Sequence, residues 1–198
     1  MIEQSQTPRQ IEIIEAALNL ISNEGIQSLT IKNLSKRIGI TEPAIYRHFE
    51  NKIQILITIL DLFKEKSKAL FDSELYKSDS AINKIEHLMN NHLQALTSKP
   101  SLINVIFSEE IFKNEKVLLD KINEVIAHNY GILTEIITDG QQNKIIREDI
   151  SASILATIIM GSLRLFIKQW QFNLHKDLME IEGAKFINAV KILIRNPQ

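Results

Sequence analysis

Residues 28–52 read SLTIKNLSKRIGITEPAIYRHFENK, and this stretch decides the fold. Apolar residues spaced as on one helix face end at Gly39, and a second short helix is expected to begin after Thr41. Glycine ends a helix in the left-handed conformation at little steric cost, Thr41 can cap the next helix by accepting from a backbone N–H, and Pro43 suits its first turn. Two helices joined by a short turn that contains glycine are predicted to form a helix-turn-helix.

The second helix of this pair, from about Glu42 to Phe49, is expected to bind DNA. Ala44, Ile45 and Phe49 give it a narrow apolar side for packing, which leaves its other residues exposed. A major groove admits one helix, whose first residues meet base edges while flanking residues meet phosphates. Five Lys and Arg stand against two Glu within residues 30–52, although an ordinary solvated face has the same balance. The prediction of DNA binding therefore depends on the helix-turn-helix motif and not on the charge count.

The same stretch resembles the tetracycline-repressor (TetR) family of transcriptional regulators. The residues that carry the resemblance are Gly25 after an amphipathic first helix, Leu29-Thr30, Gly39-Ile40-Thr41, Ile45-Tyr46-Arg47-His48-Phe49 and Asn51-Lys52. The resemblance implies an all-α protein of about nine helices. Its first part, residues 1–50, would be a three-helix DNA-binding domain, and residues 51–198 would form a helical domain for ligand sensing and dimerisation.

The family pattern, carried over residue by residue, implies two kinds of DNA contact. The residues expected to face bases are Thr41, Glu42, Pro43, Ala44 and Arg47. The residues expected to hold phosphates are Thr30, Lys36, Tyr46, His48 and Lys52. Arg47 has the chemistry for bidentate contact with guanine, Pro43 for contact with a thymine methyl, and Glu42 either accepts from cytosine or favours the helix N-terminus electrostatically.

Composition narrows the class of protein. The chain has 198 residues, a net charge of −1 and no cysteine, which removes disulfides, thiolate metal sites and cysteine nucleophiles. We expect a cytoplasmic protein, because the first residues lack the features of a signal peptide. The apolar run from Ile154 to Ile167 contains Arg164 and is shorter than a membrane span, so no membrane partner is expected.

The pattern of polar residues argues against an enzyme, a cofactor or a metal site. His87 and His92 are five residues apart and do not share a helix face, and Glu109 and Glu110 are adjacent, so their side chains diverge. The six glycines are scattered and form no phosphate-binding loop.

Helical spacing extends through the rest of the chain. A first helix is expected to begin at Thr7, with Pro8 in its first turn and Gln10 reaching back to the cap. Asn51 is expected to cap a long helix that connects DNA reading to ligand sensing. The later helices are expected at residues 52–71, 82–96, a short one from Pro100, 114–139 before Gly140, 149–171 and 177–194.

A small, largely apolar effector is expected to bind among these helices. The candidate residues are Phe63, Met89, His92, Phe107, Phe112 and His128. Phe and Met at helical spacing also occur as ordinary core residues, and each histidine could instead be a core-edge residue hydrogen-bonded to a neighbour.

The last two helices are predicted to pair with those of a second chain. The helix at residues 149–171 is apolar around most of its circumference, and Gly161-Ser162 offers a notch where another helix could approach. An isologous four-helix bundle would satisfy this pattern, and a purely intramolecular core is the alternative. Arg164 would pair with a carboxylate at the interface or bind an acidic ligand group.

These observations predict a homodimeric transcriptional repressor that an effector releases from a palindromic DNA operator. Two alternatives remain open. One is a non-transcriptional DNA-binding dimer with a role in chromosome organisation or division control, and the other is a helical enzyme or protein-interaction module.

Overall fold

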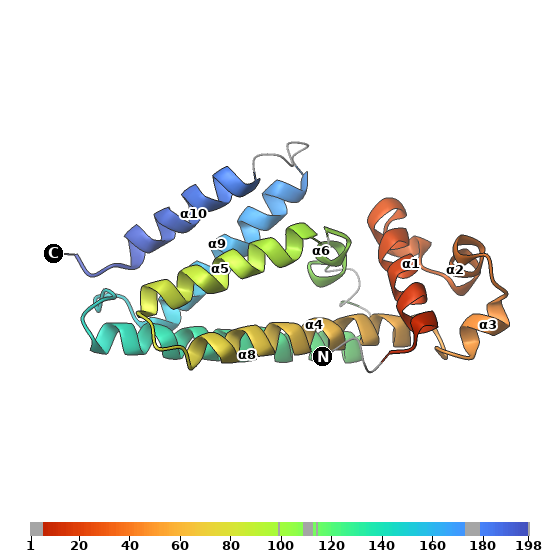
Figure 1. Ribbon diagram of the computed structural model, residues 1–198, viewed down its shortest axis with the longest axis horizontal. Coiled ribbons are helices and arrows are strands. Elements are labelled where there is room, and N and C mark those ends of the chain that lie inside the picture. Colours follow the sequence, from red (N-terminus) through yellow and green to blue (C-terminus); the bar gives the residue numbers. More distant parts are fainter. Residues whose placement is uncertain (1–5, 99, 109–112, 114, 173–178, 198) are drawn as a thin grey trace. The chain divides into compact units, whose positions relative to one another are not determined.

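The computed structural model describes residues 6–98, 100–108, 113, 115–172 and 179–197. Within them the chain forms nine α-helices, one short 3-10 helix and no strand, which confirms the all-α prediction (Figure 1). The elements are α1 (Pro8–Glu24), the 3-10 helix η1 (Ile26–Ser28), α2 (Ile31–Ile38), α3 (Glu42–Tyr46), α4 (Lys52–Leu75), α5 (Ala81–Ser98), α6 (Pro100–Ile106), α8 (Lys116–Gln142), α9 (Ala152–Phe172) and α10 (Met179–Ile194).

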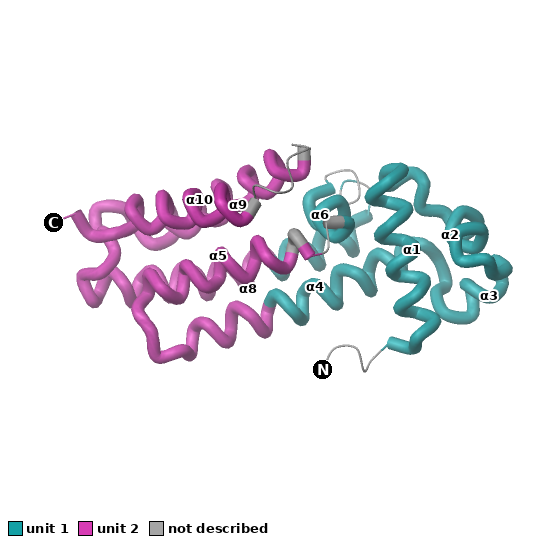
Figure 2. The backbone as a smooth tube through the Cα atoms, turned by 45° about the horizontal axis from the view of Figure 1, so that its top comes forward, with its two compact units in different colours: residues 1–67, 99–125 teal, residues 68–98, 126–198 magenta. Residues whose placement is uncertain are grey.

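The chain divides into two compact units (Figure 2). Unit 1 comprises residues 1–67 and 99–125, and unit 2 comprises residues 68–98 and 126–198. Both α4 and α8 contribute one part to each unit. The functional division at residues 50 and 51 stays a prediction.

Local hydrogen bonds begin α1 as the sequence predicts. The hydroxyl of Thr7 accepts from the Gln10 backbone N–H at 3.3 Å, and the Gln10 side-chain oxygen accepts from the Thr7 N–H at 3.0 Å. These bonds satisfy two donors that a helix N-terminus leaves unpaired. The buried face of α1, with Ile13, Ala17 and Leu20 nearly inaccessible, then packs against α2, η1 and α6 within unit 1.

Unit 2 contains an antiparallel pair, α9 and α10, with α5 packed against α10 (Figure 1). The rings of Phe166 on α9 and Phe186 on α10 stack with centroids 4.6 Å apart. Lys191 on α10 forms an ion pair with Glu86 on α5. An isolated β-bridge between Ile146 and Arg195 ties the turn after α8 to the residues that follow α10.

Gly140 has a different role from the predicted one. The sequence predicts that the helix ends before this glycine, but α8 continues through it to Gln142. A Cβ at Gly140 would lie 2.6 Å from Cδ1 of Ile146 and 2.7 Å from Cβ of Ala81. The glycine is therefore needed for close packing. The sequence of α8 alone does not predict this role, because Ala81 and Ile146 lie outside that helix.

A pair of substitutions in α8 tests this packing. Gly140→Ala should lower the free energy of unfolding by about 1–3 kcal/mol, because the added methyl overlaps side chains at both sides. Gly131→Ala is the matched control, since nothing lies within 4 Å of a Cβ there and alanine favours a helix by up to about 1 kcal/mol. Urea denaturation measures both, and equal effects would show that Gly140 is not packed as described.

Candidate DNA-binding and effector sites

The turn between α2 and α3 is built as the sequence predicts. Thr30 caps α2 by accepting from the Asn33 N–H at 3.0 Å, and the Asn33 side chain donates to the Ser28 carbonyl at 2.8 Å. Gly39 ends α2 in the left-handed conformation, with φ 79° and ψ 31°. The carbonyl of Ser35 accepts from the N–H groups of Gly39 and Ile40 at 2.9 and 3.0 Å. The chain therefore leaves α2 in one defined direction.

The start of α3 differs from the prediction in one respect. Thr41 occupies the cap position with extended backbone, but its hydroxyl accepts no hydrogen bond from α3. A capping side chain accepts from one of the first backbone N–H groups of the helix, but Pro43 has none. The next donor, the Ala44 N–H, bonds to the Thr41 backbone carbonyl at 2.9 Å. The predicted side-chain cap is wrong, and the exposed hydroxyl of Thr41 remains free of the helix backbone.

Buried side chains hold α3 against the rest of unit 1. Ile45 and Leu34 are fully inaccessible, and Phe49 follows α3 with 2% of its surface exposed. The helix itself ends at Tyr46, not at Phe49 as predicted, because the last residues form a turn in which His48 and Phe49 N–H both donate to the Ile45 carbonyl.

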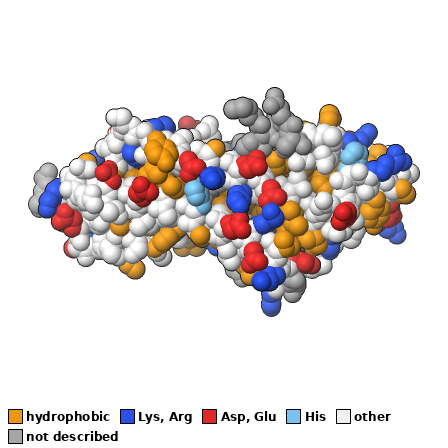
Figure 3. Space-filling model, turned by 90° about the horizontal axis from the view of Figure 1, so that it is seen from below, with side chains coloured by type: hydrophobic (Ala, Val, Ile, Leu, Met, Phe, Trp, Pro, Cys, Tyr) orange, Lys and Arg blue, Asp and Glu red, His pale blue; other side chains and the backbone are white. Residues whose placement is uncertain are grey.

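The predicted DNA-contacting residues lie around this packed support. Those that are exposed are Lys36, Thr41, Glu42, Pro43, Tyr46, Arg47 and Lys52, and those that are half-buried are Thr30, Ala44 and His48. Lys and Arg side chains gather with a histidine over α2 and α3 at the right of Figure 3. The roles of individual residues toward DNA stay predictions.

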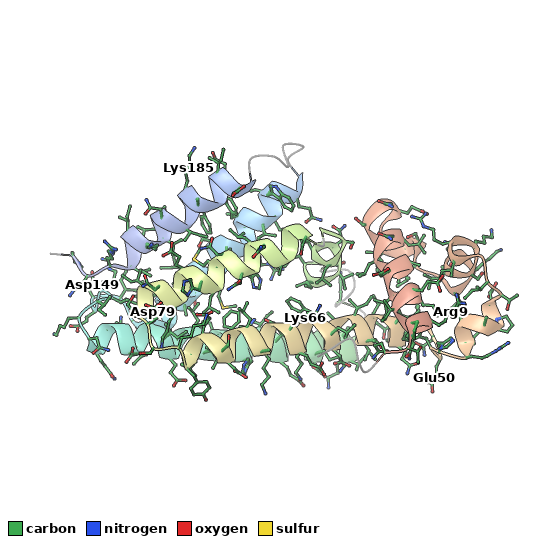
Figure 4. All side chains as sticks on the ribbon, in the orientation of Figure 1. Arg9, Glu50, Lys66, Asp79, Asp149 and Lys185 are labelled. Carbon is green, nitrogen blue, oxygen red and sulfur yellow. The ribbon has the colours of Figure 1, made fainter. Side chains whose placement is uncertain are left out.

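At the start of α4, the Gln54 side chain makes a capping hydrogen bond that was not predicted from the sequence. Asn51 accepts from the Gln54 N–H at 3.0 Å, which is the predicted cap. The Gln54 side chain also accepts from the Glu50 N–H at 2.7 Å, beside the start of α4 where Figure 4 shows Glu50. Gln three residues after Asn is a signal for such reciprocal capping, and it fixes where Lys52 begins the helix.

The effector candidates are divided between the units. Phe63 and Phe107 are half-buried in unit 1. Met89 is buried in unit 2, where His92 and His128 are half-buried. Phe112 lies outside the described residues. That these residues line one pocket stays a prediction.

The two candidate histidines have different environments. The Nε2 atom of His128 on α8 lies 2.8 Å from Oδ1 of Asp72 on α4. This contact agrees with the alternative prediction, in which the histidine is hydrogen-bonded to a neighbouring side chain. His92 has no hydrogen-bond or ion-pair partner in the described part of the chain. Burial lowers the pKa of the His92 imidazole to about 4, which keeps the ring neutral at pH 7.

The position of His92 on α5 indicates what it faces. His92 follows Ile85 by seven residues, so the two side chains point in directions that differ by only about 20°. Ile85 is completely buried, whereas His92 keeps accessible surface. His92 therefore lies on the same apolar side of α5 as Ile85 but keeps part of its surface accessible.

A separate pocket of about 390 Å³ opens at the start of α5. Its lining includes Ser80, Asn83, Lys144, Arg195 and Asn196, and none of the predicted site residues. Among the described residues, no group of three His, Cys, Asp or Glu lies close enough to hold a metal ion.

An apolar stripe is exposed on α9. Ile154, Ile158 and Leu165 are 53%, 45% and 59% exposed, and Gly161 lies between them at helical spacing. The opposite face buries Leu155 and Ile167 among others. On α10, the exposed large apolar residues are Ile181, Ile192 and Leu193.

The length of α9 corrects one expectation about membranes. The apolar run Ile154–Ile167 predicts a segment too short for a membrane span, but residues 152–171 form one helix that is long and apolar enough to cross a membrane by length and composition alone. One such helix is weak evidence for a span, and its buried face packs within unit 2. Arg164 on this helix is exposed and not buried.

A packed helix-turn-helix with an exposed α3, followed by a helical body, defines a DNA-binding regulator of the helix-turn-helix class. Residues 13–59 match the family described as "Bacterial regulatory proteins, tetR family", and residues 60–191 match "YsiA-like protein, C-terminal region". The chain belongs to the TetR family of ligand-responsive transcriptional regulators.

Named relatives are similar along most of their length. The "Fatty acid metabolism regulator protein" of Bacillus subtilis (strain 168) is 26% identical over 181 residues, which cover 89% of this chain and 91% of that protein. The "Nucleoid occlusion factor SlmA" of Vibrio cholerae is 26% identical over 166 residues, covering 81% and 84%. The crystal structure of FadR from Bacillus subtilis in complex with stearoyl-CoA has a TM-score of 0.73 at 24% identity, covering 91% and 96%. These relatives are regulators and DNA-associated factors, not enzymes.

The environment of His92 predicts how stability depends on pH. Its folded-state pKa of about 4 lies below the ordinary 6.5, so the unfolded chain binds a proton first as the pH falls. The stability is full above about pH 6.5 and should fall by about 2 kcal/mol between pH 7 and pH 5 from this residue alone. Urea denaturation at both pH values should show a smaller loss for His92→Leu. Equal losses in the two proteins would contradict the neutral imidazole.

Proposed function

We propose that the chain is a homodimeric repressor that binds a palindromic operator and leaves it when a small, largely apolar effector binds. The observation that carries the proposal is the exposed α3, which follows the left-handed turn at Gly39, is held by the buried Ile45 and is flanked by cations. A helix supported in this way has the size and exposure to enter a major groove. Effector binding and release need no catalysis, so the protein acts without being an enzyme.

The proposed DNA contacts follow the exposure of the residues. Arg47 is exposed at the end of α3 and would read guanine, and Lys52 is exposed at the start of α4 and would neutralise a phosphate. Thr30 uses an oxygen lone pair to accept from Asn33, which leaves its O–H to donate to a phosphate. The other predicted contacts keep the roles that the family resemblance implies.

The stripe on α9 supports a second copy as partner. Ile154, Ile158, Gly161 and Leu165 recur at intervals of four, three and four residues, which is the spacing of a helix-packing seam. Nothing lies within 4 Å of a Cβ at Gly161, so a partner helix could approach closely there. Pairing of α9 and α10 with their copies would bury this stripe and provide the two-fold symmetry of a palindrome.

The apolar part of the proposed effector is a long fatty acyl chain, such as that of an acyl thioester. The FadR relative is solved with stearoyl-CoA, and this chain shares its fold. His92 is a polar residue with accessible surface beside the buried Ile85 and Met89 of α5, and we propose that this side of α5 faces the acyl chain. The effector would release DNA only if it binds better to the conformation that does not fit the operator.

The similarity to SlmA favours one alternative, a nucleoid-associated factor that acts in division control. Selection of genomic DNA by the purified protein separates the two functions. A repressor should recover a few palindromes whose half-sites lie about 34 Å apart or a multiple of that distance, and stearoyl-CoA should release them. Many dispersed sites that resist the acyl-CoA would support the alternative, and no salt-sensitive duplex binding would exclude both.

The two proposed kinds of DNA contact make different predictions. Arg47→Ala should relax base preference at one operator position, at a cost of about 1–3 kcal/mol on the preferred sequence. Lys52→Ala should weaken binding to all sequences alike and reduce the salt slope by about one unit. Fluorescence anisotropy with operator and scrambled duplexes measures both. If both variants lose specificity equally, this division of roles is wrong.

A leucine at Gly161 tests the dimer interface. Gly161→Leu should leave the chain folded, because the site is open in one chain, but it should block close approach of a second α9. Gly131→Leu is the matched control, since Gly131 is also exposed and open on another helix. Light scattering at micromolar concentration should show a dimer for the wild type and the control and a monomer for Gly161→Leu. A wild-type monomer would refute the interface.

A further inference from the structure

The pocket at the start of α5 is formed by three segments of unit 2. These are the first turn of α5, the turn after α8 and the residues that follow α10, which lie at the same end of this unit (Figures 1 and 2). The pocket volume of about 390 Å³ falls within the roughly 300–1,000 Å³ that is typical of small-molecule sites. The pocket can therefore hold a small organic ligand.

Hydrogen bonds fix two walls of this pocket in the absence of a ligand. The Asn196 N–H donates to the Ile145 carbonyl at 3.1 Å, and the Asn196 side-chain amide donates to the Lys144 carbonyl at 3.2 Å. The β-bridge between Ile146 and Arg195 joins the same two segments. Because these bonds are internal to the protein, the backbone of both walls is already in place for binding.

The pocket lining contains two cations, Lys144 and Arg195, and no carboxylate. The Arg195 side chain has no hydrogen-bond or ion-pair partner within the described ranges of the chain. Lys144 contacts Glu148 at 3.4 Å, but both side chains are largely exposed, and such a pair contributes little in water. Both cations are therefore able to bind an anionic ligand.

The first turn of α5 adds hydrogen-bond donors to this positive lining. The Ser80 hydroxyl accepts from the Asn83 N–H at 3.3 Å, whereas the N–H groups of Ala81 and Ile82 come before the first intrahelical donor. Asp79 precedes this turn outside the lining, and its Oδ1 atom already accepts from the Ser80 N–H and the Asn83 side chain. The end of α5 at the pocket thus favours negative charge.

The backbone of Lys144 provides an independent reason to assign its cation a role. Its φ of 61° lies in the left-handed region, and it is the one residue other than glycine with a positive φ among those that the structure describes. Lys144 closes α8 in a Schellman motif, in which its N–H bonds to the Gln141 carbonyl and the Ile145 N–H bonds to the Gly140 carbonyl, both at 2.9 Å. Glycine fits this position without strain, so a lysine here costs stability and keeps a positive charge at the pocket.

We infer that this pocket binds the phosphate group of a small organic phosphomonoester. Two cations balance a dianion, and the guanidinium of Arg195 presents paired N–H groups that match phosphate oxygens. The apolar lining residues Ile82, Ile145 and Pro197 would contact the organic part of the ligand. The inference goes beyond the proposed function, because no residue assigned to DNA or to the acyl chain lines this pocket.

Three small anions test the chemistry of the ligand. Phenyl phosphate has both the dianion and an apolar ring, phenyl sulfate has the ring with a single charge, and inorganic phosphate has no ring. Calorimetry at pH 8 in a low-salt buffer without phosphate should show that phenyl phosphate binds about tenfold more tightly than either of the others. Absence of phenyl phosphate binding, or equal binding of phenyl sulfate or the inorganic ion, would overturn the inference.

Variants of Arg195 test the contribution of the guanidinium. Arg195→Gln should weaken phenyl phosphate about tenfold or more, and Arg195→Lys should weaken it less, because it keeps the charge without the paired N–H groups. Lys185→Gln is the matched control, since it removes an exposed cation of α10 that does not line the pocket. This control should bind phenyl phosphate within about twofold of the wild type.

A glycine at position 144 separates the loss of binding from a loss of folding. Lys144→Gly should weaken phenyl phosphate about tenfold while raising the thermal midpoint by about 2–4 °C, because glycine removes the backbone strain. Lys144→Arg keeps the cation and should keep most of the affinity. Unchanged binding in both Lys144→Gly and Arg195→Gln would overturn the inference. These measurements use neither DNA nor an acyl chain, so their failure leaves the proposed function intact.

Discussion

The carbonyl of Ser35 accepts hydrogen bonds from the N–H groups of both Gly39 and Ile40, and the direction in which the chain enters α3 depends on this one acceptor. The bonds require the left-handed backbone at Gly39, where a side chain would add strain. They set the direction in which the chain leaves α2, so that Ile45 enters the core and the remaining residues of α3 stay outside. A different turn would exchange these faces, because successive residues on a helix differ by about 100° in direction.

The sequence predicts features that depend on near neighbours. The cap at Thr7, the left-handed Gly39 and the cap at Asn51 each depend on residues three or four positions away, and all three are present. The cap at Thr41 fails because Pro43 has no N–H to donate and the Ala44 N–H bonds to the Thr41 backbone carbonyl. The packing of Gly140 could not be predicted from helical spacing alone, because its neighbours are Ala81 on α5 and Ile146 in the turn after α8. The predicted DNA contacts could not be resolved further, because they depend on a molecule outside the chain.

The apolar residues of α9 serve two surfaces. Leu155 and Ile167 belong to the interior of unit 2, whereas Ile154 and Leu165 remain in contact with solvent. Sequence alone shows a helix that is apolar around most of its circumference, and the structure separates the half that its own chain covers from the half that it does not. Exposed apolar surface of this continuity is typical of an interaction surface, and the proposed homodimer accounts for it without a membrane.

Two helices, α4 and α8, each belong to both compact units. A helix forms cooperatively, so the loss of packing around residues 68–75 of α4 weakens the hydrogen bonds that continue toward its first turn. The same holds for α8 on the other side of residue 125. Through the continuous backbone of these two helices, a change of packing in one unit can alter helix stability in the other.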